Sequence, residues 1–429
     1  MLLWYNTKPK GSMMETARHD LQLGWHYDED TGAIMRDVIH RMGRRCFRWD
    51  YCGKGTYMIT MTLADRSKPL FGRLAGESAE TAAIEPSELG RAVDAHLRRI
   101  GEFTPEIELL GAQLMPEHLH AVLRVKRRMA KPLGLALRGF KGGASQLFWR
   151  LTPPEETRRS LAERTDGEQT AKRNSERTGK ERKPPLFADG YVDNILGDEQ
   201  AIEGAIRYLA DNPRRLWEKR AHPELFKVLR EVKLALRSAS ATASAPAVPT
   251  AGLFSAIGNL ALLDAPNVFQ VQCSRSFFEY RRATDGSLLK DAPPAVETRE
   301  FIEKRDGFLE AADHGAVLLS PCISHGEREI ARLAFEKGLK VIILANKGFN
   351  PLYKPGGRLF DQCAGGNLLM LAPSAWPYVP GEKKMTRVDA CVLNRIGQWL
   401  SGAGAVEIKY RGVEPSQVDS LARAALKAD

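Results

Sequence analysis

The apolar segments in the second half of the chain constrain the fold most strongly. Residues 315–320 and 340–346 are continuous apolar runs, and residues 327–338 between them have the spacing of an amphipathic helix. A further apolar run follows at 367–373. A buried strand, a crossover helix and another buried strand are typical of a parallel sheet covered by helices. We therefore expect an α/β domain with a parallel sheet over residues 251–429.

The first half has a different pattern. Residues 57–63 alternate as a half-buried strand does, and a Pro116-Glu117 corner separates two further strand-like segments, 107–115 and 118–125. We expect an α+β domain over residues 46–235, with an antiparallel sheet and helices on one face. The helices are predicted at residues 85–102, 133–151 and 199–211, the last of them ending there because Pro213 follows.

The remaining segments are predicted to be an extension, an insert and a linker. Residues 1–45 are mixed and polar and are interpreted as an N-terminal extension. Residues 153–185 are charged and lack aromatic side chains, which is typical of a disordered or loosely helical insert. Small residues and prolines over 236–250 predict a linker between the two domains.

Composition narrows the class of protein. The 429 residues include 63 Lys and Arg against 53 Asp and Glu, and the net charge of +10 is compatible with a polyanionic partner. None of the six cysteines forms a CxxC pair, so neither a zinc ribbon nor a disulfide framework is expected. The sequence contains no signal-peptide pattern and no membrane-spanning apolar stretch, so a cytoplasmic protein is expected.

Two histidines mark a candidate metal site. His118 and His120 lie in a predicted strand, in which residues two apart share a face while Leu119 points to the other face. Both imidazoles can therefore reach one metal ion while Leu119 packs into the core. The alternative is a chance HxH pair with no ligand.

A tyrosine on a predicted helix is the second element. Tyr208 and Asn212 are four residues apart and share a helix face, so the phenol and the amide can approach one point. The alternative is a partly buried tyrosine followed by an asparagine that caps the helix before Pro213.

Three motifs occur in an order that resembles a known family. LMPEHLHAVL, LRGFKGGASQLFW and, further on, YLADNPRRL resemble the single-tyrosine HUH transposases, and most closely the REP-associated tyrosine transposases. The resemblance covers about residues 45–235 and also includes the CFRWDYCGKGTYMITMTLADRSKPLFG segment. It implies that His118, His120 and Asn212 bind a metal and that Tyr208 is the nucleophile, with Tyr191 as the competing tyrosine.

The resemblance also implies a reaction. A divalent metal neutralises a phosphodiester while the tyrosine attacks it, which gives a covalent 5′-phosphotyrosine and a free 3′-OH. Imidazole and amide ligands suit Mg²⁺ or Mn²⁺. The expected partner is single-stranded or hairpin DNA, and whether the protein acts as a monomer or a homodimer stays open.

Basic residues beside these motifs are the candidate DNA contacts, since Lys and Arg bind backbone phosphates. They precede the first strand, follow the histidine strand and follow Pro213: Arg45, Arg48, Lys126, Arg127, Arg214 and Arg215. Solvated surface charge is the alternative for each of them.

The second half distantly resembles the Rossmann-like domains of DNA-processing proteins of the DprA/Smf type. The turn at 320–326, between a strand and a helix N-terminus, is a natural anion site, although Glu327 and Glu329 weigh against a phosphate. A nucleotide or DNA is the candidate ligand. Two other functions stay open for the whole chain: a non-catalytic nucleic-acid-binding regulator, and a nucleotide-binding protein that acts through residues 251–429.

Overall fold

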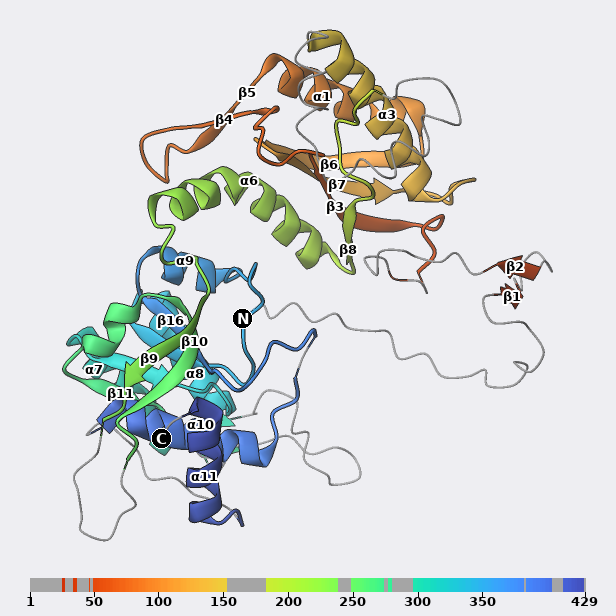
Figure 1. Ribbon diagram of the computed structural model, residues 1–429. Coiled ribbons are helices and arrows are strands. Elements are labelled where there is room, and N and C mark those ends of the chain that lie inside the picture. The colour runs from red at the N-terminus through yellow and green to blue at the C-terminus, as the bar shows by residue number, and fades with distance from the viewer. Residues whose placement is uncertain are drawn as a thin grey trace. The chain divides into compact units, whose positions relative to one another are not determined.

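The computed structural model describes residues 25–27, 34–36, 46, 49–152, 183–237, 248–273, 277–279, 296–381, 383–402 and 412–427. The chain divides into an N-terminal unit, Pro9–Glu218, and a C-terminal unit that contains Lys219–Asp429 (Figure 1). Within the described ranges, no helix combines the length and the apolar character needed to cross a membrane.

The N-terminal unit is built on an antiparallel sheet, as the sequence predicted, and the sheet has a fourth strand, β8, that was not predicted. The strand order is β6-β7-β3-β8, and every neighbouring pair is antiparallel. The strands are β3 (Gly55–Thr62), β6 (Ile107–Met115), β7 (His118–Val125) and β8 (Val192–Leu196). Two separate strand pairs complete the unit: β1 (Trp25–Tyr27) with β2 (Ile34–Arg36), and β4 (Gly72–Ala75) with β5 (Ala83–Pro86).

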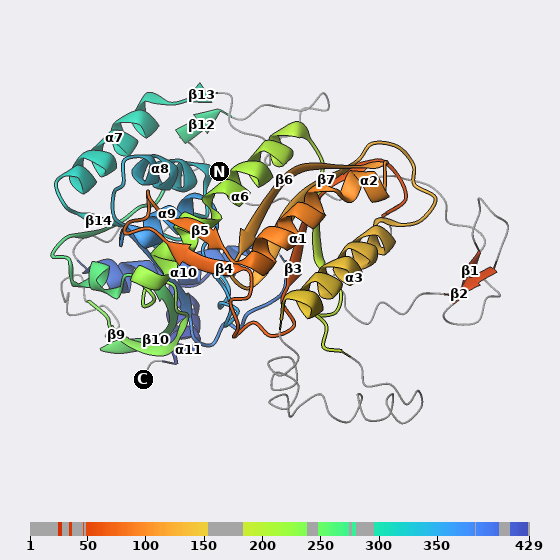
Figure 2. The same ribbon diagram turned by 90° about the horizontal axis from the view of Figure 1, so that it is seen from above.

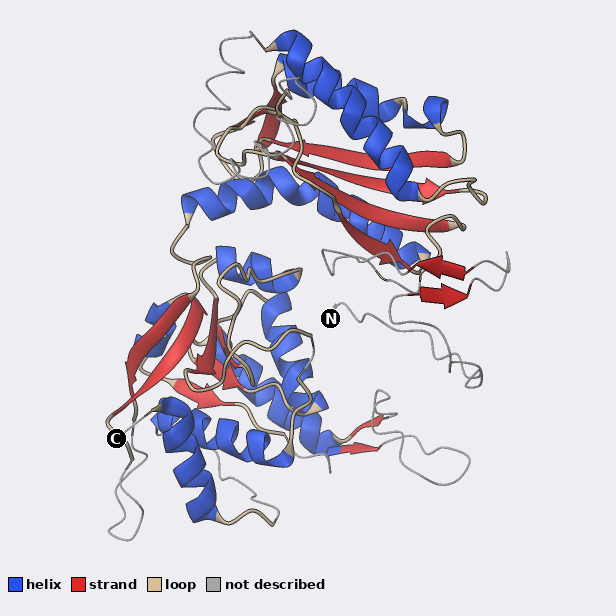
Figure 3. Cartoon of the chain, turned by 45° about the vertical axis from the view of Figure 1, so that its right-hand side comes forward, coloured by secondary structure: helices blue, strands red, loops and turns tan. Residues whose placement is uncertain are grey.

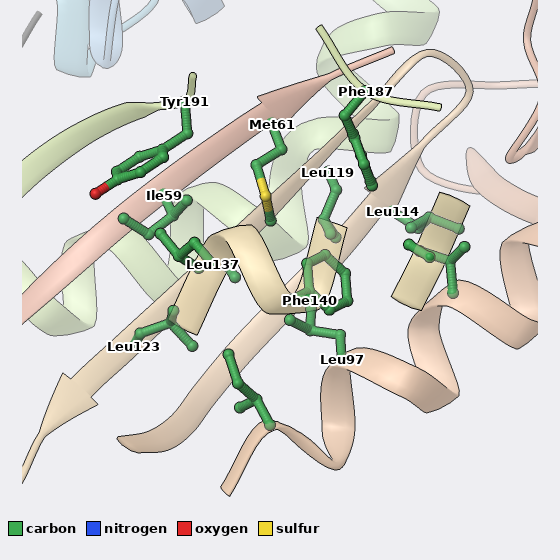
Figure 4. Packing of buried hydrophobic residues seen from close by; sticks show 14 of the residues in the cluster. Ile59, Met61, Leu97, Leu114, Leu119, Leu123, Leu137, Phe140, Phe187 and Tyr191 are labelled. Carbon is green, nitrogen blue, oxygen red and sulfur yellow. The ribbon is translucent and has the colours of Figure 1, made fainter. Parts of the chain in front are cut away.

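Two long helices cover one face of this sheet and enclose the main core. These are α1 (Glu88–Arg98), which the short α2 (Ile100–Phe103) follows, and α3 (Leu133–Leu151) (Figure 2). Helix α1 begins where the Ser87 side chain accepts a hydrogen bond from the Gly90 amide. Ile59, Leu119 and Leu137 are fully buried between the sheet and these helices (Figure 4).

A third helix covers the other face, contrary to the prediction of helices on one face only. Helix α6 (Glu199–Ala221) packs through Ile202, Ala205 and Leu209 against Met58 of β3 and Val122 of β7. Figure 1 shows α6 on the side of the sheet opposite α1 and α3. Below, this side of the sheet is called the α6 face.

Helix α6 also runs ten residues further than predicted, to Ala221 rather than Asp211. Pro213 lies inside the helix and has no N–H for the carbonyl of Leu209. The buried residues of α6 contribute roughly 1.5–3 kcal/mol for each large apolar side chain, which offsets the roughly 3 kcal/mol cost of an internal proline. Tertiary packing therefore overrides the local preference that the sequence indicated.

The C-terminal unit contains a mixed six-stranded sheet of order β11-β14-β15-β16-β10-β9. The parallel strands predicted from the apolar runs are confirmed, and β11 (Val268–Gln270) joins them. They are β14 (Val317–Ser320), β15 (Val341–Leu344) and β16 (Leu368–Pro373). An antiparallel pair that was not predicted, β9 (Leu229–Ala235) and β10 (Ala251–Gly258), extends the sheet.

Helices cover both faces of the C-terminal sheet, as the apolar strands require (Figure 3). One core lies under α10 (Arg387–Ser401) and α11 (Pro415–Leu426), and another under α7 (Arg299–Asp313) and α8 (His325–Glu336). The remaining elements are α9 (Arg358–Ala364), the 3-10 helix η2 (Leu260–Asp264), and the strand pair β12 (Phe278–Glu279) and β13 (Val296–Glu297).

The boundary between the units differs from the predicted one. Strand β9 pairs with β10, so residues 236–250 connect two strands of one sheet rather than two domains. The division falls instead after Glu218, within α6. The sequence placed residues 229–235 in the first unit because the small residues and prolines that predicted the linker begin only after them. Most of the predicted insert, 153–182, lies outside the described residues.

The close approach of α1 to Phe71, the residue before β4, gives a testable prediction. A Cβ atom at position 90 would lie 2.0 Å from the Phe71 carbonyl oxygen, so we expect Gly90→Ala to lower the free energy of unfolding by about 1–3 kcal/mol. The control is Gly204→Ala in α6, where nothing lies within 4 Å, and it should stabilise the helix by up to about 1 kcal/mol. Guanidinium unfolding of the full chain measures both variants. Equal effects would contradict the close approach at Gly90.

Candidate active site

The two histidines of β7 lie on the α6 face. Leu119 between them is fully buried in the main core on the other side of the sheet, which fixes the direction of its neighbours. His120 is itself 6% exposed, and His118 is half-buried. Thr60 of β3 is the cross-strand partner of His120. His118 and His120 therefore lie on the same face of the sheet, as the sequence predicted.

The imidazole rings are oriented by hydrogen bonds at their Nδ1 atoms. His118 Nδ1 lies 3.2 Å from Glu117 Oε1, and His120 Nδ1 lies 2.8 Å from Thr60 Oγ1. The hydrogen bond with His118 holds the pKa of Glu117 below its usual value. With both Nδ1 atoms engaged, the two Nε2 atoms face each other 3.0 Å apart. Both outward nitrogens thus point at one small region.

Tyr208 lies in the same place. Its ring packs against the ring of His120, with centroids 5.8 Å apart and an interplanar angle of 73°. The Arg215 guanidinium carbon also lies 5.5 Å from the centroid of the Tyr208 ring, within the range of a cation–π contact. Tyr208 remains 36% exposed, so its hydroxyl can be reached from solution.

Asn212 is buried one turn after Tyr208. Its side-chain nitrogen donates a hydrogen bond to the Tyr208 carbonyl oxygen at 2.9 Å, so the amide oxygen is the atom that suits a cation. Among the described residues, no group of three His, Cys, Asp or Glu side chains gathers to hold a metal. Within that described part, a third protein ligand beside the two imidazoles would be of another type, such as this amide.

The competing tyrosine lies on the other side of the sheet. Tyr191 is 6% exposed and belongs to the main core with Ile59 and Leu137 (Figure 4). The histidines point away from that core. The structure thus brings Tyr208 to His118 and His120, and separates Tyr191 from them by the thickness of the sheet.

The predicted DNA-binding residues divide into three groups. Arg214 and Arg215 lie on α6, where Arg215 contacts the Tyr208 ring and Asp211 forms ion pairs with both arginines. Lys126 and Arg127 follow the far end of β7 and are not brought to the histidines. Arg45 and Arg48 lie outside the described residues.

Two residues that orient the histidines were missed by the sequence reasoning. Glu117 directly precedes His118, and this adjacency was an available signal for it. Thr60 lies sixty residues from His120 in sequence, and only the register of β3 against β7 brings the two together. The alternation of residues 57–63 predicts which face of the strand Thr60 lies on, but it does not predict the residue on the neighbouring strand that Thr60 contacts.

The turn predicted as an anion site in the C-terminal unit is filled by the protein itself. The buried Glu327 carboxylate accepts hydrogen bonds from the amides of Ile323, at 2.7 Å, and Cys273, at 3.4 Å. Ser324 Oγ accepts from the Glu327 amide at 3.2 Å. Burial raises the pKa of Glu327. Because a buried carboxylate already accepts the Ile323 amide and Ser324 caps the Glu327 amide, negative charge from the protein itself occupies the turn that the sequence indicated as an anion site.

Comparisons with known proteins give distant matches. No family model matches the chain. An uncharacterized protein of Haemophilus influenzae is 25% identical over 184 residues, which cover 42% of this chain and 92% of that protein. A solved structure of a REP-associated tyrosine transposase bound to a REP hairpin aligns with 39% of this chain and 72% of its own, with 12% identity and a TM-score of 0.24. A TM-score of this size assigns neither fold nor activity to the chain.

The different burial of the two tyrosines predicts different reactivity. Tyr208 is 36% exposed and Tyr191 is 6% exposed, so tetranitromethane should nitrate Tyr208 several-fold faster in the native protein. Peptide mass mapping at short reaction times measures the two rates. In guanidinium the rates should become equal, which controls for intrinsic reactivity. Equal rates in the native protein would contradict the placement of Tyr191 in the core.

Proposed function

We propose that the N-terminal unit is a metal-dependent endonuclease and strand transferase for single-stranded DNA, with Tyr208 as its nucleophile. One observation carries the proposal: the Tyr208 ring packs against His120 on the face where the two imidazole Nε2 atoms lie 3.0 Å apart. A nucleophile beside two convergent nitrogen ligands suits attack on a phosphodiester, in which negative charge must be neutralised.

The histidine pair fits a divalent ion. Two donors bound at right angles, about 2.1 Å from one ion, lie about 3.0 Å apart, which matches the Nε2 separation of 3.0 Å. Metal-ligating histidines characteristically use the other ring nitrogen for a hydrogen bond that fixes the ring. His118 has such a bond with the Glu117 carboxylate and His120 with the Thr60 hydroxyl. Mg²⁺ or Mn²⁺, with Asn212 as a further ligand, would withdraw negative charge from the scissile phosphate.

The protein's own residues then account for the transfer step. The Tyr208 phenol gives up its proton, its oxygen forms a bond to phosphorus, and the bond from phosphorus to the 3′ oxygen breaks. The 3′ oxygen takes up a proton and leaves as a hydroxyl. The product is a 5′-phosphotyrosine, and attack on it by a strand's 3′-OH restores Tyr208 and joins the DNA.

Arg215 would hold the nucleophile in place. Its side chain is 11% exposed, and it lies over the Tyr208 ring, which His120 also contacts. A ring held by two contacts loses less freedom on the way to the reactive geometry. Asp211, 3.7 Å from the guanidinium, supplies part of the counter-charge for this half-buried cation.

The covalent adduct is the direct test of this function. Hairpin oligonucleotides with single-stranded flanks, incubated with Mn²⁺, should give a protein–DNA adduct that survives a denaturing gel. Tyr208→Phe removes the attacking oxygen and should abolish the adduct, and His120→Ala should lower its yield at least about a hundredfold. Tyr191→Phe is the matched control and should retain the adduct, since Tyr191 lies in the core.

The opposite pattern would overturn the assignment. Loss of the adduct with Tyr191→Phe but not with Tyr208→Phe would make Tyr191 the nucleophile. DNA binding with no adduct on any oligonucleotide would favour the non-catalytic regulator instead.

The residues that orient the imidazoles give a second prediction. Thr60→Val and Glu117→Gln should each weaken Mn²⁺ binding about 10–100-fold, because each removes or weakens a hydrogen bond that orients a ligand. Titration calorimetry with Mn²⁺ alone measures the affinity. Thr56→Val is the control, since Thr56 is on the same strand but four residues away. An effect of Thr56→Val equal to that of Thr60→Val would contradict the assigned role of Thr60.

A further inference from the structure

Exposed basic residues gather at the end of β7 that is remote from His118. This group, called here the basic end, consists of Lys54, Lys126, Arg127, Arg128 and Lys131, all of them exposed. The sequence had placed Lys126 and Arg127 next to the cutting site. Their actual position moves any contact with backbone phosphates away from that site.

Backbone contacts bring the two segments of the basic end together. Gly55 is the partner of Val125 in the sheet, so Lys54, which precedes β3, and Lys126, which follows β7, lie at the same end of the two strands. Beyond them the Met129 amide donates to the Cys52 carbonyl at 2.8 Å. The five cations therefore belong to one surface and not to two unrelated loops.

The charge of this surface is only partly compensated. Arg128 pairs with Asp50 at 2.6 Å, and Arg127 lies 3.6 Å from Glu106. In the described part of the chain no ion pair engages Lys54, Lys126 or Lys131, and all three are exposed. Three uncompensated ammonium groups attract a polyanion, and lysine contacts to phosphate carry no base specificity.

The spacing relates this surface to the candidate active site. Lys126 is eight residues after His118 along a regular strand. At about 3.3 Å per residue this separates the two by about 26 Å. The scissile phosphate and a phosphate at the basic end would thus be about eight base steps apart in a duplex, since one step is about 3.4 Å.

We propose that the basic end is a second contact surface for the DNA that enters the active site. It binds backbone phosphates about 26 Å from the scissile bond and so sets a minimum length for the base-paired stem beside the single-stranded target. This inference rests on the proposed function for its choice of DNA. It adds a length requirement that the cutting site alone does not impose.

Binding to DNA of increasing length tests the proposal. Hairpins with one constant single-stranded flank and stems of about 4, 8 and 12 base pairs are titrated against full-length Tyr208→Phe protein, which cannot cut them. The test variant adds Lys126→Gln and Lys131→Gln, which leave no carboxylate without a partner. The matched control adds Lys233→Gln and Lys340→Gln, two exposed lysines of the C-terminal unit.

The proposal expects affinity to rise until the stem reaches about eight base pairs and then to level off. Lys126→Gln with Lys131→Gln should remove that rise and leave binding of the shortest hairpin unchanged. On long stems this pair should also lower the slope of log affinity against log salt by about 1.8, or about 0.9 per lost phosphate contact. The control pair should behave like its parent protein.

Two results would overturn the proposal: no rise in affinity with stem length, or a rise that survives loss of both lysines. The outcome is separable from that of the proposed function. A lysine-dependent rise with no covalent adduct from the wild-type protein would leave the contact surface in place and remove the enzymatic activity. An adduct with no lysine-dependent rise would support the enzymatic activity and remove the contact surface.

Discussion

The alternation of side chains along β7 is the constraint on which both the core and the candidate site depend. Leu119 and Leu123 are fully buried against α1 and α3, so His118 and His120 must face α6. A shift of one residue would bury both imidazoles in the main core and expose the leucines, which the apolar environment forbids. The packing that stabilises the sheet thereby also fixes the direction of the two candidate ligands.

Helix α6 supplies the other half of the arrangement. Leu209 closes the second core against Met58 and Val122, and the adjacent Tyr208 is consequently held at the edge of that core, beside His120. Because the helix continues through Pro213, Arg215 follows two turns after Tyr208 and covers its ring. A helix that ended at Asp211 would have left the tyrosine without this contact.

What the sequence could predict is what depends on local periodicity. The HxH spacing in an apolar strand was enough to place both histidines on one face, and continuous apolar runs were enough for the parallel strands. Contacts between segments that are distant in sequence could not be predicted in this way. The hydrogen bond between Thr60 and His120 depends on the register of the sheet. Residues 229–235 belong to the C-terminal unit because β9 pairs with β10. Closeness in sequence also gave a wrong position for Lys126, which follows the strand of the histidines but lies at the end of that strand remote from His118.

The most direct measurement is the site of covalent attachment in the wild-type protein. The adduct formed with hairpin DNA and Mn²⁺ is digested with nuclease and trypsin and analysed by mass spectrometry. Cleavage after Arg207 separates the peptide 208–214, which contains Tyr208, from the peptide 183–207, which contains Tyr191. A nucleotide on peptide 208–214 is the predicted result. A nucleotide on peptide 183–207, or on no tyrosine peptide, would contradict the assignment of His118, His120 and Tyr208 to one active site.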